Sequence, residues 1–187
     1  MNQTTRDDPA YTDALQMLKD DHAKVKKIFD QFEKERDTAG LEDKRLLVKR
    51  ACQELSIHAQ LEEEIFYPAM RESVDADDAL DEAEVEHGSI KELVTDLEFM
   101  EPDDALYDAK FKVLAEYVTH HVSEEEGEIF PAAKRAKVDL KQLASELSER
   151  KEQLVAIFGI QDDEQDILSA VTARRSSGGD TGSSKSH

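Results

Sequence analysis

Two stretches of this chain nearly repeat each other, and each carries a histidine and a glutamate four residues apart. Residues 58–68 begin His-Ala-Gln-Leu-Glu, residues 121–131 begin His-Val-Ser-Glu-Glu, and a proline ends each stretch ten residues after its histidine. On an α-helix, positions i and i+4 lie on the same face, so each stretch can direct an imidazole and a carboxylate toward one point. Two such stretches facing each other would form a two-metal site.

Four segments of the chain have apolar residues at three- and four-residue spacing, the pattern of helices in a bundle. A histidine interrupts the apolar stripe near the middle of every segment, and in two segments a glutamate follows on the same stripe. These inward-facing candidates are His22, His58, Glu62, His87, His121 and Glu125. Ionisable groups in a core are costly unless they are paired or bind a metal. The sequence therefore predicts that these six residues are metal ligands.

The same stripes predict which other residues face the core. In the second helix Ile65 and Ala69 continue the stripe after the glutamate, and in the third Glu84 precedes the histidine. In the fourth helix the stripe includes Tyr117 and Glu128.

The order of helix and turn signals predicts an all-α fold, an antiparallel up-down-up-down four-helix bundle with an additional C-terminal helix. Expected helices span about residues 11–36, 42–72, 77–100 and 103–136, followed by a fifth at 140–158 and a shorter piece at 166–173. The corresponding domains are a flexible N-terminal arm (1–10), the bundle (11–136), a C-terminal helical extension (137–173) and a disordered tail (174–187).

Composition restricts the partners and the compartment. The formal net charge is −20 over 187 residues, and such a surface repels nucleic acid and anionic lipid. Cys52 is the sole cysteine, so a disulfide framework is excluded. The N-terminus lacks the apolar segment of a signal peptide. We therefore expect a cytoplasmic protein that binds neither nucleic acid nor a membrane, whose protein partner, if any, the sequence does not identify.

The ligand types indicate the metal. Imidazole and carboxylate together suit iron, manganese and zinc, and six ligands exceed the four that usually close a structural zinc site. They suit two ions bridged by Glu62 and Glu125, while the assignment of each histidine to an ion stays open. His120 competes with His121 because it too has a glutamate four residues later, but the proline spacing favours His121 and predicts an exposed His120.

Taken together, these motifs resemble the hemerythrin-like, HHE cation-binding domain over about residues 14–135. The resemblance rests on Asp-His at 21–22, Glu-His at 86–87 and the two repeated stretches. It implies a four-helix bundle around two non-haem iron ions (Fe²⁺/Fe³⁺), with manganese or zinc as alternatives, and an open coordination position for dioxygen or a related ligand. The six candidate residues fall on the family's ligand positions.

One position departs from the oxygen-carrying hemerythrins, which have a second histidine one turn after the first on the third helix. Here that position is Lys91. The loss of an imidazole leaves more open positions or brings in an extra carboxylate, with Glu63, Glu84 and Glu126 as options. A more anionic ligand set favours ferric iron, and so favours oxidation or peroxide chemistry over reversible oxygenation.

Three functions are compatible with these features. The first is a module that binds or senses dioxygen, nitric oxide or iron, and the second is a di-iron oxidase or a peroxidase- or catalase-like enzyme that protects against oxidative stress. The third is a stress-related interaction protein with a structural metal. Whether the chain is an enzyme is left open by the sequence.

Overall fold

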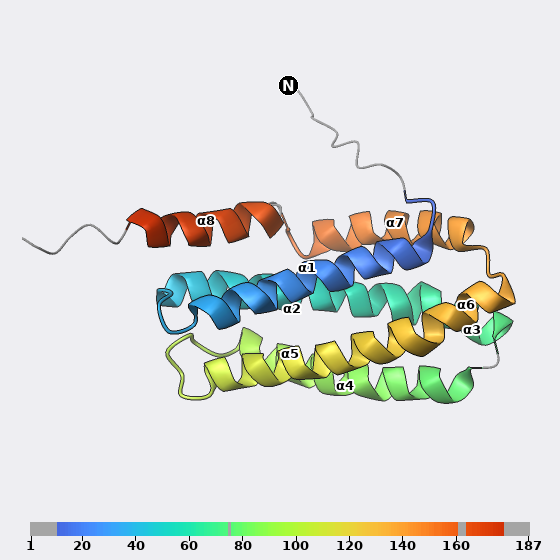
Figure 1. Cartoon of the computed structure of the whole chain (residues 1–187), viewed down its shortest axis with the longest axis horizontal. Helices are drawn as coiled ribbons and strands as arrows, with labels where there is room; N and C mark the ends of the chain where they lie inside the picture. The colour runs from blue at the N-terminus through green and yellow to red at the C-terminus, as the bar shows by residue number, and fades with distance from the viewer. Residues whose placement is uncertain (1–10, 75, 161–163, 178–187) are drawn as a thin grey trace, which may run out of the picture.

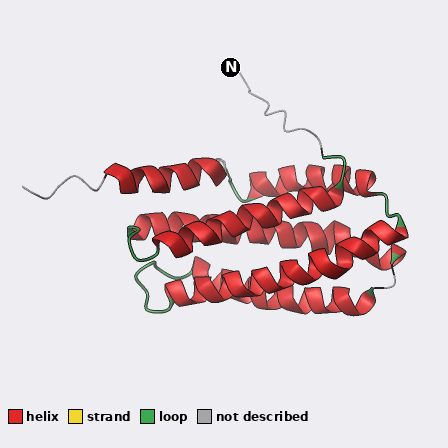
Figure 2. Cartoon of the chain, viewed as in Figure 1, coloured by secondary structure: helices red, strands yellow, loops and turns green. Residues whose placement is uncertain are grey.

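The computed structural model describes residues 11–74, 76–160 and 164–177, and these residues form helices and connecting turns without a β-strand (Figure 2). The all-α fold class is therefore confirmed. Within the same ranges, every helix is too short or too polar to span a lipid bilayer. The expected N-terminal arm (1–10) lies outside the described residues, as does the tail from residue 178 onward.

Four long helical segments form the bundle, and each neighbour runs antiparallel to the next (Figure 1). The helix α1 packs against α2 and α5, and α4 packs against the same two helices. Short π-helical turns, η1 and η2, interrupt the second and fourth segments. In chain order the elements are α1 (Ala14–Glu35), α2 (Leu41–Leu61), η1 (Glu62–Phe66), α3 (Tyr67–Ser73), α4 (Asp77–Glu98), α5 (Tyr107–Glu124), η2 (Glu125–Ile129) and α6 (Phe130–Ala136).

The helix boundaries follow local capping and turn chemistry. The Asp13 side chain accepts hydrogen bonds from the backbone N–H groups of Leu15 and Gln16 and so caps α1. The start of the fourth segment is corrected: α5 begins at Tyr107 rather than near residue 103. The Asp104 side chain accepts from the backbone N–H of Glu101 and holds residues 101–106 in turns, which delays the helix.

Each π-turn begins at a candidate ligand glutamate and ends just before a proline. The backbone N–H of Tyr67 donates to the carbonyl of Glu62, five residues earlier, and that of Phe130 donates to the carbonyl of Glu125. A proline has no N–H and its ring collides with the carbonyl four residues earlier in an α-helix. Because the widened turns immediately precede Pro68 and Pro131, the repeated proline marks the position of the π-turn.

The extra residue in each π-turn rotates the following helix, so the inward stripe shifts by one position. In the second segment Phe66 and Met70 are fully buried, whereas the expected Ile65 and Ala69 are only partly buried. In the fourth segment Ile129 is buried where Glu128 was expected.

Two further expectations about inward-facing residues are wrong. Glu84 is exposed and pairs with Arg71, and Ala83 takes its place in the core. Tyr117 is 49% exposed, while Val118 is buried. In both cases the position one residue away carries the smaller, apolar side chain, which packs against the neighbouring helix without burying a polar group.

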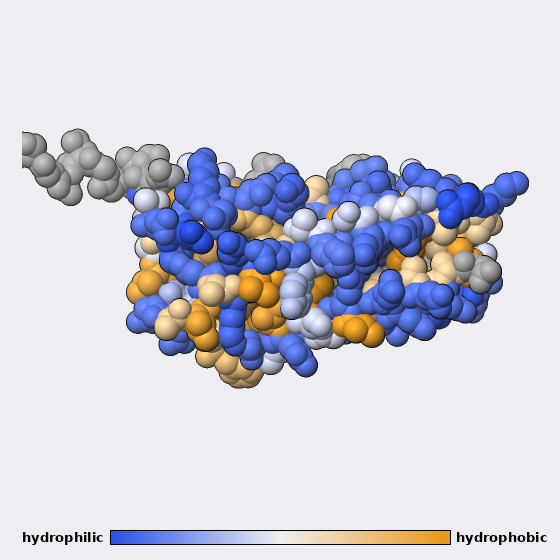
Figure 3. Space-filling model, turned by 60° about the horizontal axis from the view of Figure 1, so that its bottom comes forward, coloured by the Kyte–Doolittle hydropathy of each residue, from blue (hydrophilic) through white to orange (hydrophobic). Residues whose placement is uncertain are grey.

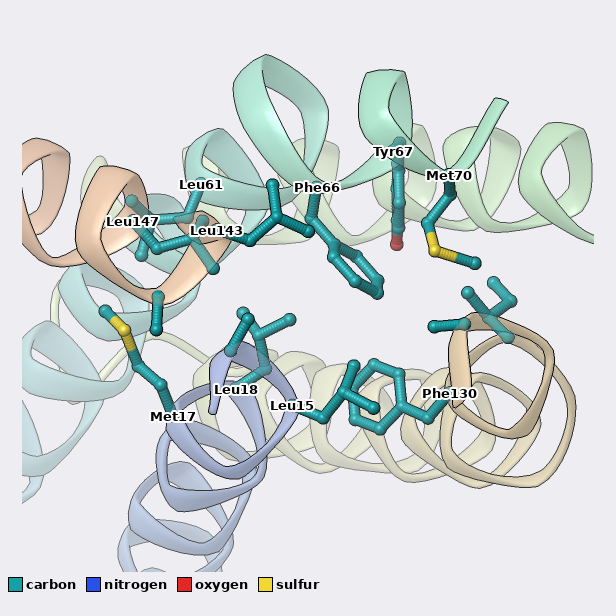
Figure 4. Packing of buried hydrophobic residues seen from close by; sticks show 14 of the residues in the cluster. Leu15, Met17, Leu18, Leu61, Phe66, Tyr67, Met70, Phe130, Leu143 and Leu147 are labelled. Atoms are coloured by element: carbon teal, nitrogen blue, oxygen red, sulfur yellow. The ribbon is translucent and has the colours of Figure 1, made fainter. Parts of the chain in front are cut away.

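The hydrophobic core consists of two clusters with the polar candidates between them. The cluster near the ends of α3 and α6 includes Leu15, Leu18, Phe66 and Phe130, and Figure 4 shows these side chains pointing toward one another. The other cluster lies nearer the α4–α5 connection and is built around Phe111 and neighbouring aromatic and aliphatic side chains. Burial of these side chains from water supplies the main free energy of folding.

The C-terminal extension packs along the bundle. The helices α7 (Leu140–Ile157) and α8 (Glu164–Ser177) lie on α1 and α2, with α7 contributing to the first cluster and Val171 of α8 to the second (Figure 1). Because α8 continues to Ser177, residues 174–177 of the expected tail are helical. The face of the molecule drawn in Figure 3 is mainly hydrophilic, with separate hydrophobic patches.

Candidate metal centre

The structure brings all six sequence-predicted residues into one buried layer between the two hydrophobic clusters. Each is at least 93% buried. The imidazoles form two pairs through their Nε2 atoms: His22 and His58 are 3.0 Å apart, and His87 and His121 are 3.1 Å apart. The pairs thus follow the two halves of the sequence, with one histidine from each helix of a hairpin.

Glu62 lies between the two histidine pairs. Its Oε1 is 3.0 Å from His58 Nε2, and its Oε2 is 3.4 Å from His87 Nε2. Two groups of possible ligand atoms result, one with His22, His58, Glu62 and Glu125 and one with Glu62, His87 and His121. Because Glu62 belongs to both groups, it has the position that a bridging ligand would need.

Glu125 is placed differently from its counterpart. Its Oε2 is 3.2 Å from Nε2 of His22, on the facing helix α1, and it groups with the first histidine pair. The sequence predicted that Glu125 also bridges, but in this arrangement it belongs to one group. The second group consequently has three candidate ligands instead of four.

The outer nitrogen, Nδ1, of each histidine faces a carboxylate from another helix. His22 faces Glu126, His87 faces Glu63 and His121 faces Glu86, all at 2.9 Å, and His58 faces Asp21 at 3.8 Å. Carboxylates in this position fix the orientation and tautomer of a ligand histidine. Glu63 and Glu126, considered above as extra ligands, therefore contact the outer face of the imidazoles.

Each of these outer carboxylates is adjacent in sequence to a predicted ligand. This adjacency is a signal in the sequence that could have identified them. Glu63 and Glu126 each directly follow a candidate ligand glutamate, and Asp21 and Glu86 each directly precede a candidate ligand histidine. Sequence reasoning did not foresee that each would serve a histidine on a different helix. Only the packing of the helices brings Asp21 to His58 and Glu86 to His121.

Three of the four outer carboxylates are neutralised by a lysine. Lys19 lies 3.1 Å from Glu126, Lys91 pairs with both oxygens of Glu63, and Lys151 of α7 donates to Asp21. Glu86 differs from these, because its neighbours are His121 and the exposed His120. His120 is 66% exposed, as the sequence predicted, and lies outside the buried layer.

The donor set fits a cation. When the Nδ1–H groups of His87 and His121 donate to Glu63 and Glu86, the Nε2 lone pairs of these two histidines face each other 3.1 Å apart, which is repulsive unless a proton or metal ion lies between them. The same repulsion arises between His22 and His58, whose Nε2 atoms are 3.0 Å apart, when both imidazoles carry their proton on Nδ1. Several carboxylate oxygens of the same layer are buried without a hydrogen-bond donor, namely Glu62 Oε1 and both oxygens of Glu125. Metal ions would satisfy both sets of atoms at once.

Burial and neighbouring charges shift several pKa values in the layer. Burial and the negative charge of Glu62 raise the pKa of Glu125 to about 7. Burial lowers the pKa of His121, whereas for His58 the Glu62 and Asp21 carboxylates outweigh burial and raise the pKa. For Asp21, hydrogen bonding to His58 and the charge of Lys151 outweigh burial and hold the pKa at about 2. The adjacent buried carboxylates of Glu62 and Glu125 thus cannot both be charged easily without a cation.

The two halves of the centre differ in one aromatic residue. Tyr67 stacks on His87 with ring centroids 5.6 Å apart, and Phe130, its counterpart in the repeat, stacks on His22 at 5.9 Å. Only the tyrosine has a hydroxyl, which donates to Glu62 Oε2 at 3.4 Å. Burial and the two glutamates raise the pKa of Tyr67, so this hydroxyl stays protonated.

A small cavity adjoins the layer on the side of the second hydrophobic cluster. It has a volume of about 20 Å³ and is lined by the four histidines and by apolar side chains that include Leu55 and Ile90. A groove of about 350 Å³ between α1 and α5 shares His22, Val118 and Val122 with this cavity. These three side chains thus lie between the groove and the cavity.

An antiparallel helical bundle with buried histidine pairs and a shared glutamate defines the class of hemerythrin-like metal-binding proteins. The family model described as the hemerythrin HHE cation binding domain matches residues 13–133. This chain belongs to that family, and the resemblance inferred from the motifs is confirmed. The helices α7 and α8 lie beyond the matched residues.

A solved structure has a similar fold. It is the crystal structure of a hemerythrin HHE cation binding domain-containing protein from Mycobacterium kansasii, with a TM-score of 0.66 and 21% sequence identity. The similarity covers 86% of this chain and 99% of that chain. A comparison with the sequences of curated proteins found no match.

Proposed function

We propose that this chain is a non-haem di-iron protein that binds or senses dioxygen, nitric oxide or iron itself. The observation that supports the proposal most directly is the position of Glu62, whose two oxygens face different histidine pairs. A carboxylate shared in this way suits two ions held close together, typically about 3.5–4 Å apart. The mixture of imidazole and carboxylate, without a thiolate in the layer, favours iron, with manganese or zinc as alternatives.

The two ions would have unequal surroundings. The first group would hold its ion with His22, His58, Glu62 and Glu125, and the second with Glu62, His87 and His121. The second ion therefore keeps more positions for an external ligand, as an open site requires. Bound iron would supply reversible electron transfer to a small oxidant or coordination of a diatomic gas.

The protein's own residues would limit that ligand to a small molecule. The cavity of about 20 Å³ has room for about one water-sized molecule. The apolar side chains on its wall, among them Leu55 and Ile90, disfavour charged ligands, which would lose part of their hydration there. Tyr67 is placed to donate a hydrogen bond to Glu62 and to hold its proton at the centre.

The test is metal analysis of protein purified without chelator, followed by anaerobic titration of the apo protein with Fe²⁺. Two iron ions per chain, and near-ultraviolet absorption after oxidation, are expected. A protein that binds one zinc ion tightly and takes up no iron would contradict the proposal. His120→Ala serves as a matched control, because His120 lies outside the layer while the adjacent His121 lies within it.

A di-iron oxidase or a peroxidase- or catalase-like activity is the second candidate. It is favoured by the buried carboxylates, because anionic ligands stabilise ferric iron, and by the protonated tyrosine beside them. Addition of peroxide to the iron-loaded protein separates the two candidates. Repeated turnover with release of oxygen supports an enzyme, whereas a single stoichiometric oxidation supports the binding or sensing function.

A further inference from the structure

The centre has four edges, one at the outer nitrogen of each buried histidine and its carboxylate. The edge at His121 differs from those at the other three histidines. At those edges a lysine ammonium stands beside the outer carboxylate, at Lys19, Lys91 and Lys151. At this edge Glu86 contacts His121 Nδ1 at 2.9 Å and exposed His120 at 3.4 Å. A positive charge repels an approaching cation, so the His121 edge is electrostatically the open one.

Further carboxylates gather at this edge. A cavity of about 30 Å³ between α4 and the α5–η2 segment is lined by Glu82, Glu86, Glu124 and Glu128. Among the described residues, neither Glu82 nor Glu128 pairs with a lysine or arginine. The π-turn η2 and the small side chains of Ala79 and Ala83 leave this space open beside His121.

At the inner end of the cavity lies the buried carboxylate of Glu125, whose Oε2 is 3.2 Å from His22 Nε2. Glu125 is 1% exposed, lines the same cavity, and has a carboxylate that receives no hydrogen bond. At the outer end, Glu86, His120 and Glu124 offer ligand atoms within 4.8 Å of one another. Glu86 belongs to both ends, because one oxygen faces His120 and the other faces His121.

We propose that this acidic cavity is the route by which divalent metal ions reach the buried centre, with Glu86, His120 and Glu124 as a transient outer site. The proposal rests on the proposed metal-binding function and adds to it the path of loading. An ion would pass from the outer group to the carboxylate of Glu125, which receives no hydrogen bond, without crossing the apolar core. Clefts lined by one sign of charge concentrate ions of the opposite sign and raise association rates by about 10–1000-fold.

The test is the rate at which the full-length apo protein takes up Co²⁺ without air. Stopped-flow absorbance records this rate, and Co²⁺ keeps its oxidation state in the absence of an oxidant. The variant E82Q/E124Q/E128Q removes three charges from the route without altering the six candidate ligands. Its control, E98Q/E149Q/E152Q, removes three charges from exposed glutamates elsewhere, so the net charge of the two variants is equal. We expect loading of the first variant to be about tenfold slower than that of the control, with the same final stoichiometry.

Equal loading rates for the two triple variants would overturn the proposal. A second test needs only one surface substitution. E128K should load more slowly than its control, E98K. Both differences should shrink as salt screens the charges. Failure of the proposed function is a distinct result, because the wild-type protein would then reach no stoichiometric endpoint at any rate.

Discussion

Lys91 Nζ lies 2.6 Å and 2.5 Å from the two carboxylate oxygens of Glu63, and Glu63 in turn lies 2.9 Å from His87 Nδ1. The lysine that replaces a carrier-type histidine therefore neutralises an outer carboxylate at the edge of the centre. Removal of its charge leaves Glu63 a stronger acceptor for the His87 N–H, which makes the imidazole more electron-rich. This chain of contacts connects an exposed lysine to the electronic state of the metal.

We predict that Lys91→Met lowers the reduction potential of the loaded protein. A more electron-rich imidazole stabilises ferric over ferrous iron, and each tenfold preference corresponds to about 59 mV for a one-electron couple. Because Lys91 is half-exposed, solvent screens its charge and the shift should be smaller than that. Spectroelectrochemical titration measures the potential, with Lys112→Met as the control on an exposed lysine of α5. An unchanged or raised potential would contradict the prediction.

The di-ferrous protein should oxidise irreversibly in air, because the buried carboxylates stabilise ferric iron. A histidine at position 91 would slow this autoxidation only if that position faced the centre. Since the side chain reaches outward to Glu63, we expect that Lys91→His does not lengthen the lifetime of any oxygenated species and changes it only in the direction that loss of the lysine charge does in Lys91→Met. Stopped-flow absorbance after mixing with dioxygen measures this lifetime. A long-lived adduct that releases dioxygen under vacuum would show that the wild-type protein is a carrier.

The buried layer of histidine and glutamate side chains was predictable because its constraint is local. A histidine and a glutamate four residues apart share a helix face in any packing, and the apolar stripes fixed which face is buried. The π-turns were not read from the sequence, although Pro68 and Pro131 signalled an interruption. As a result, Ile65 and Ala69 were expected in place of Phe66 and Met70.

Contacts between helices could not be predicted in the same way. The i+4 spacing suggested that Glu125 acts with His121, but the structure brings it to His22. Such a pairing depends on how far one helix is rotated and shifted against another, and η2 changes that rotation by inserting one residue. The pairing of Asp21 with Lys151 depends on the docking of α7, which no motif in the bundle specifies.

The different positions of Glu62 and Glu125 predict different outcomes for their removal. Glu62→Ala takes a ligand from both groups and should abolish the binuclear centre. Glu125→Ala takes a ligand from the first group only, so about one ion per chain should remain at the three-ligand group, which can complete its coordination with water. Iron analysis after gel filtration measures both, and Glu116→Ala, at an exposed glutamate of α5, is the matched control. Equal loss of iron in the two variants would indicate that Glu125 also bridges.

Removal of the metal should lower the thermal stability of the protein. The apo protein keeps facing imidazole nitrogens and unpaired carboxylate oxygens in its core. A metal bound only to the folded state stabilises it by about 4 kcal/mol when its free concentration is a thousand times the Kd. Differential scanning calorimetry should show a clear increase in Tm on loading, and His58→Ala/His87→Ala should show none. Coincident curves for the apo and loaded wild-type protein would mean that the layer binds no metal.

Cys52 should be unreactive in the folded protein. Burial, followed by the charge of Glu98, raises the pKa of its thiol to about 12. The thiol reacts as its thiolate, and at pH 8 a group with this pKa is protonated almost completely, so the reactive fraction rises only as the pH approaches 12. Iodoacetamide should therefore alkylate Cys52 in denaturant but not in buffer, as measured by mass spectrometry. Rapid alkylation of the native protein would show that the α2 packing around Cys52 opens readily.

Lys151 should couple the C-terminal helix to the stability of the centre. Its ammonium donates to Asp21, which is 5% exposed and lies beside His58. Lys151→Met leaves the Asp21 charge buried without its cation, and removal of one partner from a buried pair costs about 3–5 kcal/mol. Urea denaturation of the apo protein measures this loss, with Lys141→Met on the exposed side of α7 as the control. In the double variant Asp21→Asn/Lys151→Met the stranded charge is gone, so part of the lost stability should return. If Lys151→Met unfolds at the same urea concentration as Lys141→Met, α7 packs on the bundle without supporting Asp21.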